Sequence, residues 1–207
     1  MIWLGLMNKL LIATGNRHKT GELRTMLGPG WVLEDLNDHS DLVPAEEDCN
    51  TFEGNAIKKA VEISAQRPGV LVMADDSGLE VDALKGEPGV RSARYAGAGA
   101  GDAGNRIHLL AELSRLEPQP NEPLTARFRC VLALARDGEC LATFDGAVEG
   151  RIIRAARGSG GFGYDPLFIP EGHEQTFAEL PADVKHSMSH RARALGKAVK
   201  SLQELAG

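Results

Sequence analysis

A stretch of alternating residues constrains the fold of this 207-residue chain more than any other feature. In TARFRCVLALARDGECLATFDGAV, residues 125–148, apolar side chains take every second position of the first half: Phe128, Cys130, Leu132 and Leu134. A period of two is typical of a β-strand. The Asp137-Gly138 pair in the middle is a strong signal for a two-residue turn. The stretch therefore predicts a long β-hairpin.

Further strands and helices surround this hairpin. Strands are predicted at residues 9–14, 31–36, 70–74, 79–84, 150–153 and 167–170. Helices are predicted at residues 19–27, from near Asn50 to the RPG at 67–69, at 105–116, and from near Ser189 onward. Because strands and helices do not alternate strictly, we expect an α/β fold in which a mixed, twisted sheet is flanked by helices.

Two of these helices carry more detailed expectations. The second is predicted to be capped by Asn50, with Glu53 completing a capping box. Its buried face is expected at Ile57, Ala60, Val61 and Ser64. The last helix is expected to bury Leu195, Val199, Leu202 and Ala206.

The composition is ordinary for a globular protein and disfavours general nucleic-acid binding. Hydrophobic residues make up 43% of the chain and charged residues 25%, so the chain can bury a core. The net charge is −6, whereas proteins that bind duplexes are usually basic. The length favours one domain over residues 1–207.

The cysteines and the N-terminus bear on location. Cys49, Cys130 and Cys140 are odd in number and have no zinc spacing, which predicts reduced thiols in a cytoplasmic protein. The N-terminal MIWLGLMNKLLIATG is short, lacks a basic leader and is interrupted by Lys9, so no signal peptide or membrane span is expected. Met7 offers an alternative start, and we interpret residues 1–8 as an extension.

In VLVMADDSG, residues 70–78, a predicted strand runs into two adjacent carboxylates. Asp75 and Asp76 repel each other, so a positive charge is expected beside them. Neighbours on a strand point to opposite faces, and both acids reach one site only if the strand bends. We expect Ser77-Gly78 to supply that bend. The alternative is a turn in which the acids cap backbone groups.

A second acidic cluster, Glu46-Glu47-Asp48, precedes a predicted helix. Acids favour helix N-termini in any case, which is the alternative explanation. Mg²⁺ binds one or two carboxylates together with phosphate oxygens. One acid from this cluster and one from Asp75-Asp76 would meet that need.

The stretch ATGNRHK, residues 13–19, combines a strand end, a tight turn and a helix start. Backbone N–H groups at such a junction bind phosphate, and Lys19 adds positive charge. The stretch is not a P-loop, because His18 stands where a glycine must precede the lysine. An ordinary strand-to-helix turn is the alternative.

The stretch GSGGFG, residues 158–163, matches the dinucleotide fingerprint in letters only. A strand is predicted after it rather than a helix, so a Rossmann site is rejected. What remains is a flexible loop presenting Phe162, Tyr164 and Asp165, in which an aromatic ring can lie against a base. The alternative is a plain connector.

The stretch KHSMSHRAR, residues 185–193, places cations at the start of a predicted helix, where the dipole disfavours them. An anion is therefore expected between them and the helix end, and a solvated basic face is the alternative. His186 and His190 have the spacing of a zinc pair but lack a third ligand. With the acids and the aromatic loop, these cations suit a nucleoside polyphosphate.

The same segments resemble the inosine/xanthosine triphosphate pyrophosphatase family, in order, from about Lys9 to the last helix. The resemblance rests on ATGNRHKTGEL, TFEGNAIKKA, ADDSGLEVDALKGEPGVRSARYAG, ARFRCVLAL, GSGGFGYDPLF, TFAEL and KHSMSHRARAL. It implies Mg²⁺-dependent hydrolysis of ITP, dITP and XTP to the monophosphate and pyrophosphate, which keeps deaminated purines out of nucleic acid. It also implies two lobes around a central nucleotide-binding cleft, and a homodimer.

The resemblance also assigns roles by motif position. Asp76 would be the general base and a metal ligand, Asp75 would support it, and Glu47 would be the second metal ligand. The residues implied to hold the triphosphate are Thr14, Gly15, Asn16, Arg17, His18, Lys19 and Ser77. Those implied to hold the nucleoside are Phe162, Gly163, Tyr164, Asp165, Lys185, His190 and Arg191.

Departures from the family pattern stand near the second helix: Asp48-Cys49 where Thr-Gly is expected, and Gly54 where an acid is more common. Two other functions compete with nucleoside triphosphate pyrophosphatase activity on purines. One is the hydrolysis of modified pyrimidine triphosphates, as in septum-inhibitor-like pyrophosphatases, which the SHR and GGFGYDP motifs disfavour. The other is a nucleotide sensor without turnover, which has little use for the carboxylates.

Overall fold

The computed structural model of this chain describes residues 8–116 and 123–206. The predicted N-terminal extension lies outside this range apart from Asn8. The stretch EPQPNEP at 117–123, whose composition predicts a linker, lies outside it apart from Pro123. Among the described helices, none combines the length and the apolar character needed to cross a membrane.

A six-stranded sheet forms the framework, with the strand order β2-β1-β3-β4-β5-β6. Its strands are β1 (Asn8–Ile12), β2 (Trp31–Asp35), β3 (Val72–Val81), β4 (Leu124–Arg136), β5 (Glu139–Ile152) and β6 (Phe168–Pro170). β1 pairs in parallel with both β2 and β3, whereas β5 and β6 pair antiparallel. The mixed sheet predicted from the sequence is confirmed.

The predicted hairpin is formed by β4 and β5. They are joined by Asp137-Gly138, whose φ angles of 54° and 80° lie in the left-handed region. Two consecutive residues of this kind match the twist of the flanking strands, which is why Asp-Gly is favoured there. The strand predicted at 150–153 is the end of β5 rather than a separate strand.

The described chain divides into two compact units. The first consists of the residues up to Asp76, Val131–Asp145 and the chain from Ala194 onward, and the second of Ser77–Cys130 and Gly146–Arg193. Two units agree with the two lobes expected from the sequence. The central cleft and the single domain stay predictions.

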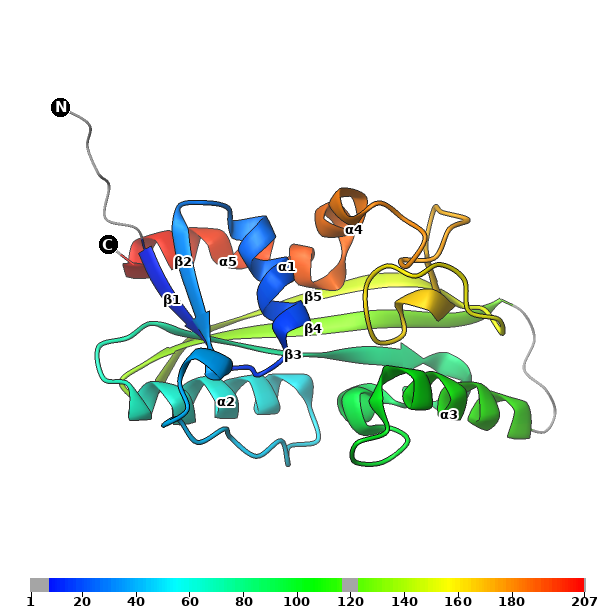
Figure 1. Cartoon of the computed structure of the whole chain (residues 1–207), viewed down its shortest axis with the longest axis horizontal. Helices are drawn as coiled ribbons and strands as arrows, with labels where there is room; N and C mark the ends of the chain where they lie inside the picture. The colour runs from blue at the N-terminus through cyan, green and yellow to red at the C-terminus, as the bar shows by residue number, and fades with distance from the viewer. Residues whose placement is uncertain (1–7, 117–122, 207) are drawn as a thin grey trace. The chain divides into compact units, whose positions relative to one another are not determined.

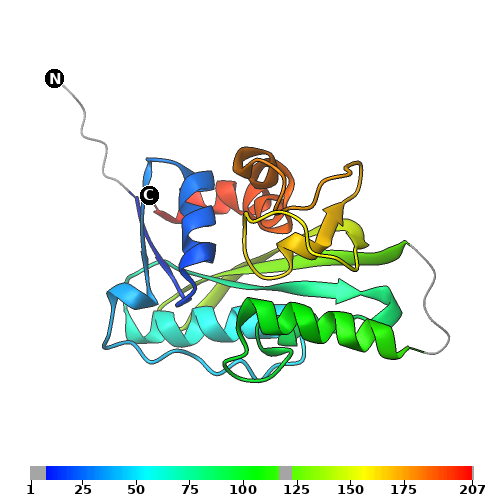
Figure 2. The ribbon, with the colours of Figure 1, turned by 45° about the vertical axis from the view of Figure 1, so that its right-hand side comes forward.

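In the first unit, helices cover both faces of the strands. Figures 1 and 2 show α1 (Arg17–Leu27) and the later part of α5 (His190–Ala206) on one side, and α2 (Phe52–Gln66) on the other. The strand residues between them are apolar and buried: Leu10, Leu11, Ile12, Val72, Met73 and Ala74. Burial on both faces is typical of parallel strands. Helices α1 and α2 can therefore each deliver a side chain to β3 from their own side.

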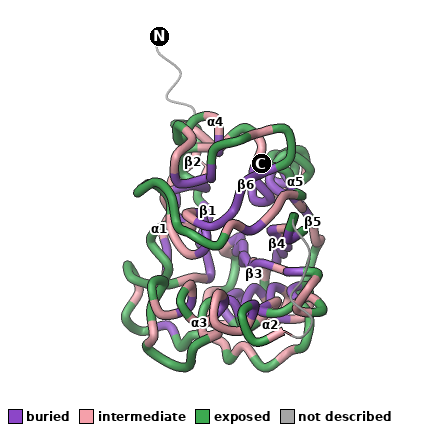
Figure 3. The backbone as a smooth tube through the Cα atoms, turned by 90° about the vertical axis from the view of Figure 1, so that its right-hand side faces the viewer, coloured by how far each residue is buried: buried purple, intermediate pink, exposed green. Residues whose placement is uncertain are grey.

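The second unit has an apolar core of its own. Helix α3 (Gly101–Arg115) packs there along the second half of β3 (Figure 2). Core members include Leu79, Val81, Leu109, Leu113, Phe128, Phe168 and Phe177. In Figure 3 the strands are largely buried, whereas many of the connections are exposed. The remaining elements are α4 (Ala182–Met188), which was not predicted, and η1 (Leu36–Asp38), η2 (Asp82–Leu84), η3 (Gly89–Arg94) and η4 (Asp165–Leu167).

Helix α2 differs from its prediction in cap and buried face. Thr51, not Asn50, is the N-cap, and its side chain accepts the N–H of Gly54 at 3.0 Å. The Glu53 carboxylate binds the Thr143 hydroxyl, 3.1 Å away. The buried residues of the helix are Phe52, Asn55, Ala56, Lys59, Ala60, Ile63 and Ser64, so the expected Ile57 and Val61 are only half-buried. Three of the buried residues are polar, Asn55, Lys59 and Ser64, and only Ser64 was part of the predicted face.

The two departures from the family pattern are neighbours in space. A Cβ atom added to Gly54 would lie 3.0 Å from the Cβ of Cys49 and 3.0 Å from the Thr51 hydroxyl oxygen. A side chain at position 54 would crowd the Thr51 cap and the Cys49 side chain. Glycine at position 54 leaves room for Cys49.

Two more helix predictions need correction. Helix α3 begins at Gly101, four residues before the start predicted at residue 105. In α5, Val199 is 37% exposed, and Ala198 takes the buried position next to it. Leu195 and Leu202 are buried as predicted, so the apolar face of α5 departs from the predicted stripe at position 199.

Candidate active site

The two adjacent acids lie inside one continuous strand. β3 runs through Asp75, Asp76 and Ser77, and Gly78 is an ordinary extended residue of the strand. The bend predicted at Ser77-Gly78 is therefore wrong. Both acids are buried, Asp75 at 0% and Asp76 at 5% exposure, and they point to opposite faces of the sheet.

Asp75 is neutralised from the side of α1. Lys19 Nζ lies 2.7 Å from its Oδ1 and 3.4 Å from its backbone oxygen. The Lys19 side chain is only 14% exposed, so this is a largely buried ion pair. The positive charge expected beside the acids is present.

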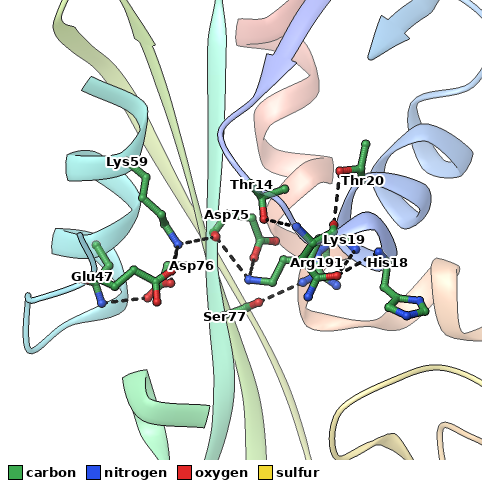
Figure 4. A network of polar contacts seen from close by, with 12 residues as sticks. Thr14, His18, Lys19, Thr20, Glu47, Lys59, Asp75, Asp76, Ser77 and Arg191 are labelled. Carbon is green, nitrogen blue, oxygen red and sulfur yellow. Dashed lines mark hydrogen bonds and ion pairs between the residues drawn. The ribbon is translucent and has the colours of Figure 1, made fainter. Parts of the chain in front are cut away.

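Asp76 is neutralised from the side of α2 (Figure 4). Lys59 Nζ donates to Asp76 Oδ1 at 2.7 Å, to Glu47 Oε1 at 2.9 Å and to the Asp75 backbone oxygen at 2.9 Å. Asn55 donates its side-chain N–H to Asp76 Oδ2 at 3.3 Å. One ammonium group therefore holds Glu47 and Asp76 together.

Burial raises the pKa of Asp76, and Lys59 opposes that rise. Burial alone would lower the pKa of Lys59, but Asp76 and Glu47 outweigh it and raise that pKa. Lys59 is thus firmly charged. Asp76 has a greater affinity for a proton than an ordinary aspartate, which suits a general base.

The turn between β1 and α1 shares a cavity with Glu47 and Lys59 in the first unit. The cavity has a volume of about 130 Å³, and the residues that line it include Thr14, Gly15, Glu47 and Lys59. The predicted phosphate turn and the predicted metal ligand thus share a cavity. Arg17 and His18 are exposed on the first turn of α1.

Asn16 shapes that turn. It is the N-cap of α1, and its side-chain oxygen accepts the backbone N–H of His18 at 3.0 Å and of Lys19 at 3.3 Å. The Asn16 N–H in turn binds the Thr14 hydroxyl at 3.1 Å. These bonds explain why α1 begins at Arg17 rather than at residue 19. The role of the turn in phosphate binding stays a prediction.

In the second unit, Asp165 organises the Gly-rich loop. Its Oδ2 accepts the Phe162 backbone N–H at 2.8 Å and the Lys185 ammonium at 2.6 Å. Lys185 Nζ also lies 5.0 Å from the centre of the Phe162 ring, within the range of a cation–π contact. The loop residues and the lysine assigned to the nucleoside are therefore brought together.

Ser77 and the SHR residues also meet in this unit. Arg191 is fully buried, donates to the Ser77 hydroxyl at 3.0 Å, and lies 5.8 Å from the Phe162 ring centre. The His190 ring stacks on Phe128, with ring centres 4.9 Å apart and planes 14° apart. Core packing thus fixes the first turn of α5.

The predicted cationic helix start needs a partial correction. Lys185 belongs to the last turn of α4, where a cation suits the helix dipole, whereas His190, Arg191 and Arg193 belong to the first turn of α5. Tyr164, predicted to contact the nucleoside, directs its hydroxyl to the Ser92 backbone oxygen at 2.9 Å and is buried. In the structure, Tyr164 anchors the Gly-rich loop to the backbone at Ser92.

Lys59 and Asn55 are site residues that the sequence prediction missed. Both lie in TFEGNAIKKA, a motif that was recognised without assigning them roles. The available signal was their spacing, because they share a helix face with the buried Phe52, Ala56 and Ile63. A lysine on a buried helix face needs an acidic partner.

Among the described residues, no group of three or more histidines, cysteines and acids gathers around one point to hold a metal. Two carboxylates, those of Glu47 and Asp76, both face the ammonium group of Lys59. Oxygen ligands of this number suit Mg²⁺, which takes its other ligands from water and phosphate.

Comparisons with known proteins find relatives over nearly the whole chain. The chain is 49% identical over 198 residues to a dITP/XTP pyrophosphatase of Desulforamulus reducens, covering 95% of this chain and 96% of the relative. It is 45% identical over 199 residues to a dITP/XTP pyrophosphatase of Bacillus subtilis, covering 96% and 98%.

Solved structures give the same result. The Ham1 protein of Coxiella burnetii matches with a TM-score of 0.82 and 37% identity, over 96% of this chain and 100% of that one. The Ham1 protein of Staphylococcus aureus matches with a TM-score of 0.80 and 34% identity, over 95% and 98%. A sequence profile of the Ham1 family matches residues 10–201. The family predicted from the motifs is confirmed, and the chain belongs to the Ham1 family.

Proposed function

We propose that this protein hydrolyses dITP, ITP and XTP to the nucleoside monophosphate and pyrophosphate, with Mg²⁺ as cofactor. The observation that carries the proposal is the Asp76–Lys59–Glu47 arrangement, in which Asp76 and Lys59 are buried and which provides a base and two oxygen ligands at one point. The names of the curated relatives supply the substrate class. Such an activity would keep deaminated purines out of nucleic acid.

Glu47 and Asp76 would hold the metal ion. Their carboxylates already share one cation, Lys59, at 2.9 and 2.7 Å, so the pair is arranged around positive charge. When bound, Mg²⁺ would neutralise charge on the phosphate oxygens. Lys59 would remain close enough to keep both carboxylates ionised.

Asp76 would accept a proton from the water that attacks the α-phosphorus. Its raised pKa improves proton transfer, and Asn55 fixes the orientation of its carboxylate. Attack at this phosphorus breaks the bond to the bridging oxygen and releases pyrophosphate in one piece. Asp75 would act indirectly, because its ion pair orients Lys19.

The β1–α1 turn would bind the polyphosphate. Lys19 supplies positive charge. The N-terminal end of α1, next to Thr14, Gly15 and Asn16, carries the positive end of the helix dipole and so favours the negatively charged polyphosphate. The exposed Arg17 and His18 would contribute charge and hydrogen bonds from the same turn. Phosphoryl chemistry depends mostly on such positioning and neutralisation.

The second unit would select the base. Phe162 offers a ring face, and Lys185, His190 and Arg191 offer hydrogen-bond donors that suit the 6-oxo group of hypoxanthine or xanthine. The 6-amino group of adenine would leave such buried donors unpaired, which rejects it strongly. Ser77, bound to Arg191, would lie at the start of this unit.

The proposal is tested by measuring turnover of ITP, XTP, dGTP and ATP with and without Mg²⁺, with products separated by chromatography. We expect IMP and pyrophosphate from ITP, the corresponding products from XTP, and no turnover of ATP. Release of a single phosphate, or equal use of ATP, would contradict both the reaction and the assignment of the base-selecting residues.

A cytoplasmic location and a homodimer belong to the same proposal. The three free cysteines and the nucleotide substrate support the first. The family resemblance is the support for the second. Light scattering on the eluting peak of a size-exclusion column should give twice the mass of one chain, and a monomer mass would contradict the dimer.

A further inference from the structure

Residue Gly163 of the Gly-rich loop is held on both sides by one helix of the second unit. Asp102 Oδ2 accepts the Gly163 backbone N–H at 2.6 Å, and Arg106 donates to the Gly163 backbone oxygen at 2.7 Å. The two side chains are four residues apart on α3 and so lie on one face of that helix. The backbone N–H and the backbone carbonyl of Gly163 are therefore both hydrogen-bonded to side chains of α3.

This contact matters because the loop has little stiffness of its own. Four of the six residues 158–163 are glycine, the residue that loses most conformational freedom on ordering. Gly163 has a φ of +59°, a conformation that other residues rarely adopt. The loop must therefore be ordered by contacts from outside it.

The Gly163 contacts control the direction of the preceding ring. The Gly163 N–H lies in the peptide plane that follows Phe162, and the Gly163 carbonyl lies in the next plane. Fixing both planes limits the backbone rotation that would swing Phe162 away. Asp165 holds the Phe162 N–H at 2.8 Å from the other side.

We propose that Asp102 and Arg106 are positioning residues that hold the Gly-rich loop in its base-binding conformation. The inference rests on the proposed function, because it assumes that Phe162 receives the base. Neither side chain needs to touch the nucleotide. Their charges make the two hydrogen bonds stronger than neutral ones, so their loss should loosen the loop.

The test uses Asp102→Ala and Arg106→Met, with Asp102→Asn and Arg106→Lys as conservative variants that keep an acceptor and a donor. Arg115→Ala is the matched control, because Arg115 lies on the same helix and pairs with Glu112 at the exposed surface. Each protein is assayed for ITP turnover. Binding of IMP and of pyrophosphate is measured by calorimetry.

We expect KM for ITP and Kd for IMP to rise about tenfold in Asp102→Ala and Arg106→Met, the effect of losing one charge-assisted hydrogen bond. The value of kcat and the affinity for pyrophosphate should change less than about twofold on the same reasoning. The conservative variants should recover part of the loss. Hydrogen exchange should quicken in residues 158–165 and not in the control.

Unchanged KM and Kd in both variants would overturn the proposal. Equal losses of IMP and pyrophosphate binding, or a loss that tracks a lower unfolding temperature, would also overturn it by revealing a merely structural role. A wild-type protein that neither hydrolyses ITP nor binds IMP would overturn the proposed function itself. The wild-type measurement therefore separates the two failures.

Discussion

Asp75 and Asp76 are neighbours of the same residue type, yet the structure gives them different partners. Alternation along β3 turns Asp75 toward Lys19 of α1 and Asp76 toward Lys59 of α2. Only Asp76 also shares its cation with a second acid, Glu47. In the proposed mechanism, the helix that each carboxylate faces therefore separates the catalytic Asp76 from the supporting Asp75.

Replacing Asp76 by Asn should lower kcat for ITP by at least about 10²- to 10⁴-fold, because the amide cannot accept the proton of the attacking water. Steady-state kinetics at saturating Mg²⁺ measure this. Asp145→Asn is the control, since Asp145 is an acid of the same unit that pairs with Lys197 on the surface. Turnover of Asp76→Asn near the wild-type rate would remove Asp76 as the base.

Replacing Lys59 by Met should destabilise the fold by about 3–5 kcal/mol, because Glu47 and Asp76 lose their shared buried charge. Mg²⁺ should restore more stability to this variant than to wild type, since it can compensate both carboxylates. Denaturant unfolding with and without Mg²⁺ measures both effects.

The neighbouring Lys58→Met is the matched control for that substitution. Lys58 pairs with Asp48 at the surface, and exposed pairs contribute little. Its stability should stay almost unchanged. If the two lysine variants unfolded alike, the shared-cation account of the site would be wrong.

Asp35 gives a pH-dependent prediction beside the predicted phosphate turn, because its partner Asn37 also donates to the Gly15 backbone oxygen at 3.0 Å. Burial raises its pKa, but hydrogen bonds from Thr20 and Asn37 outweigh this and lower the pKa below 3.8. A lowered pKa stabilises the fold above pH 3.8, and that contribution is lost as the pH falls through the folded-state pKa. Asp35→Asn should therefore cost about 1 kcal/mol at neutral pH.

Thermal unfolding of wild type and Asp35→Asn from pH 7 to pH 3 tests this sign. The difference in stability between the two proteins should be largest at neutral pH. It should narrow as the pH falls below 3.8, the ordinary pKa of an aspartate. A gap that widens toward low pH would contradict the assignment.

At the scale of the elements, strand β3 shows why a polar residue does not end a strand by itself. The sequence predicts that the strand ends at Asp75-Asp76 and bends at Ser77-Gly78, because buried acids are costly. Two lysines from different helices remove that cost, and the strand continues to Val81. The partners lie 56 and 17 residues away in the chain, so no local pattern reveals them.

Glycines test the pairing of β5 with β6. A Cβ added to Gly150 would lie 2.3 Å from the Ile169 backbone oxygen and 2.6 Å from the Phe168 ring. Gly150→Ala should therefore destabilise the protein by about 1–3 kcal/mol or more, the usual range for overpacking. Urea unfolding measures the change.

Gly196→Ala in α5 is the matched control with the opposite expected sign. No atom lies within 4 Å of the added Cβ, and Gly196 is in a helix interior. Alanine should stabilise it by about 0.5–1 kcal/mol. Equal effects of the two substitutions would mean that close backbone approach at Gly150 does not limit the sheet.

At the scale of the whole molecule, regular patterns predicted the elements better than the site. The β4–β5 hairpin, the parallel strands and most helices follow from period and turn residues, which act locally. Helix ends were less predictable: Asn50 and Thr51 are both good caps, and only tertiary packing selects Thr51. Helix α4 is short and carries no clear apolar period.

The candidate site was predicted in part because its residues belong to recognisable motifs. The motifs predict roles for Glu47, Asp76, Asp165 and Lys185. Lys59, Asn55, Asp102 and Arg106 were not assigned, since each acts through contacts with segments distant in sequence. Residues that hold other residues in place leave only a weak signal in a single sequence.

The central claim is that Asp76 directs water to the α-phosphorus of a deaminated purine nucleotide. Hydrolysis of ITP in oxygen-18 water, with both products examined by mass spectrometry, tests it most directly. The account predicts Mg²⁺-dependent formation of IMP carrying the heavy oxygen, together with unlabelled pyrophosphate. Label in the pyrophosphate, or release of labelled single phosphate, would contradict it.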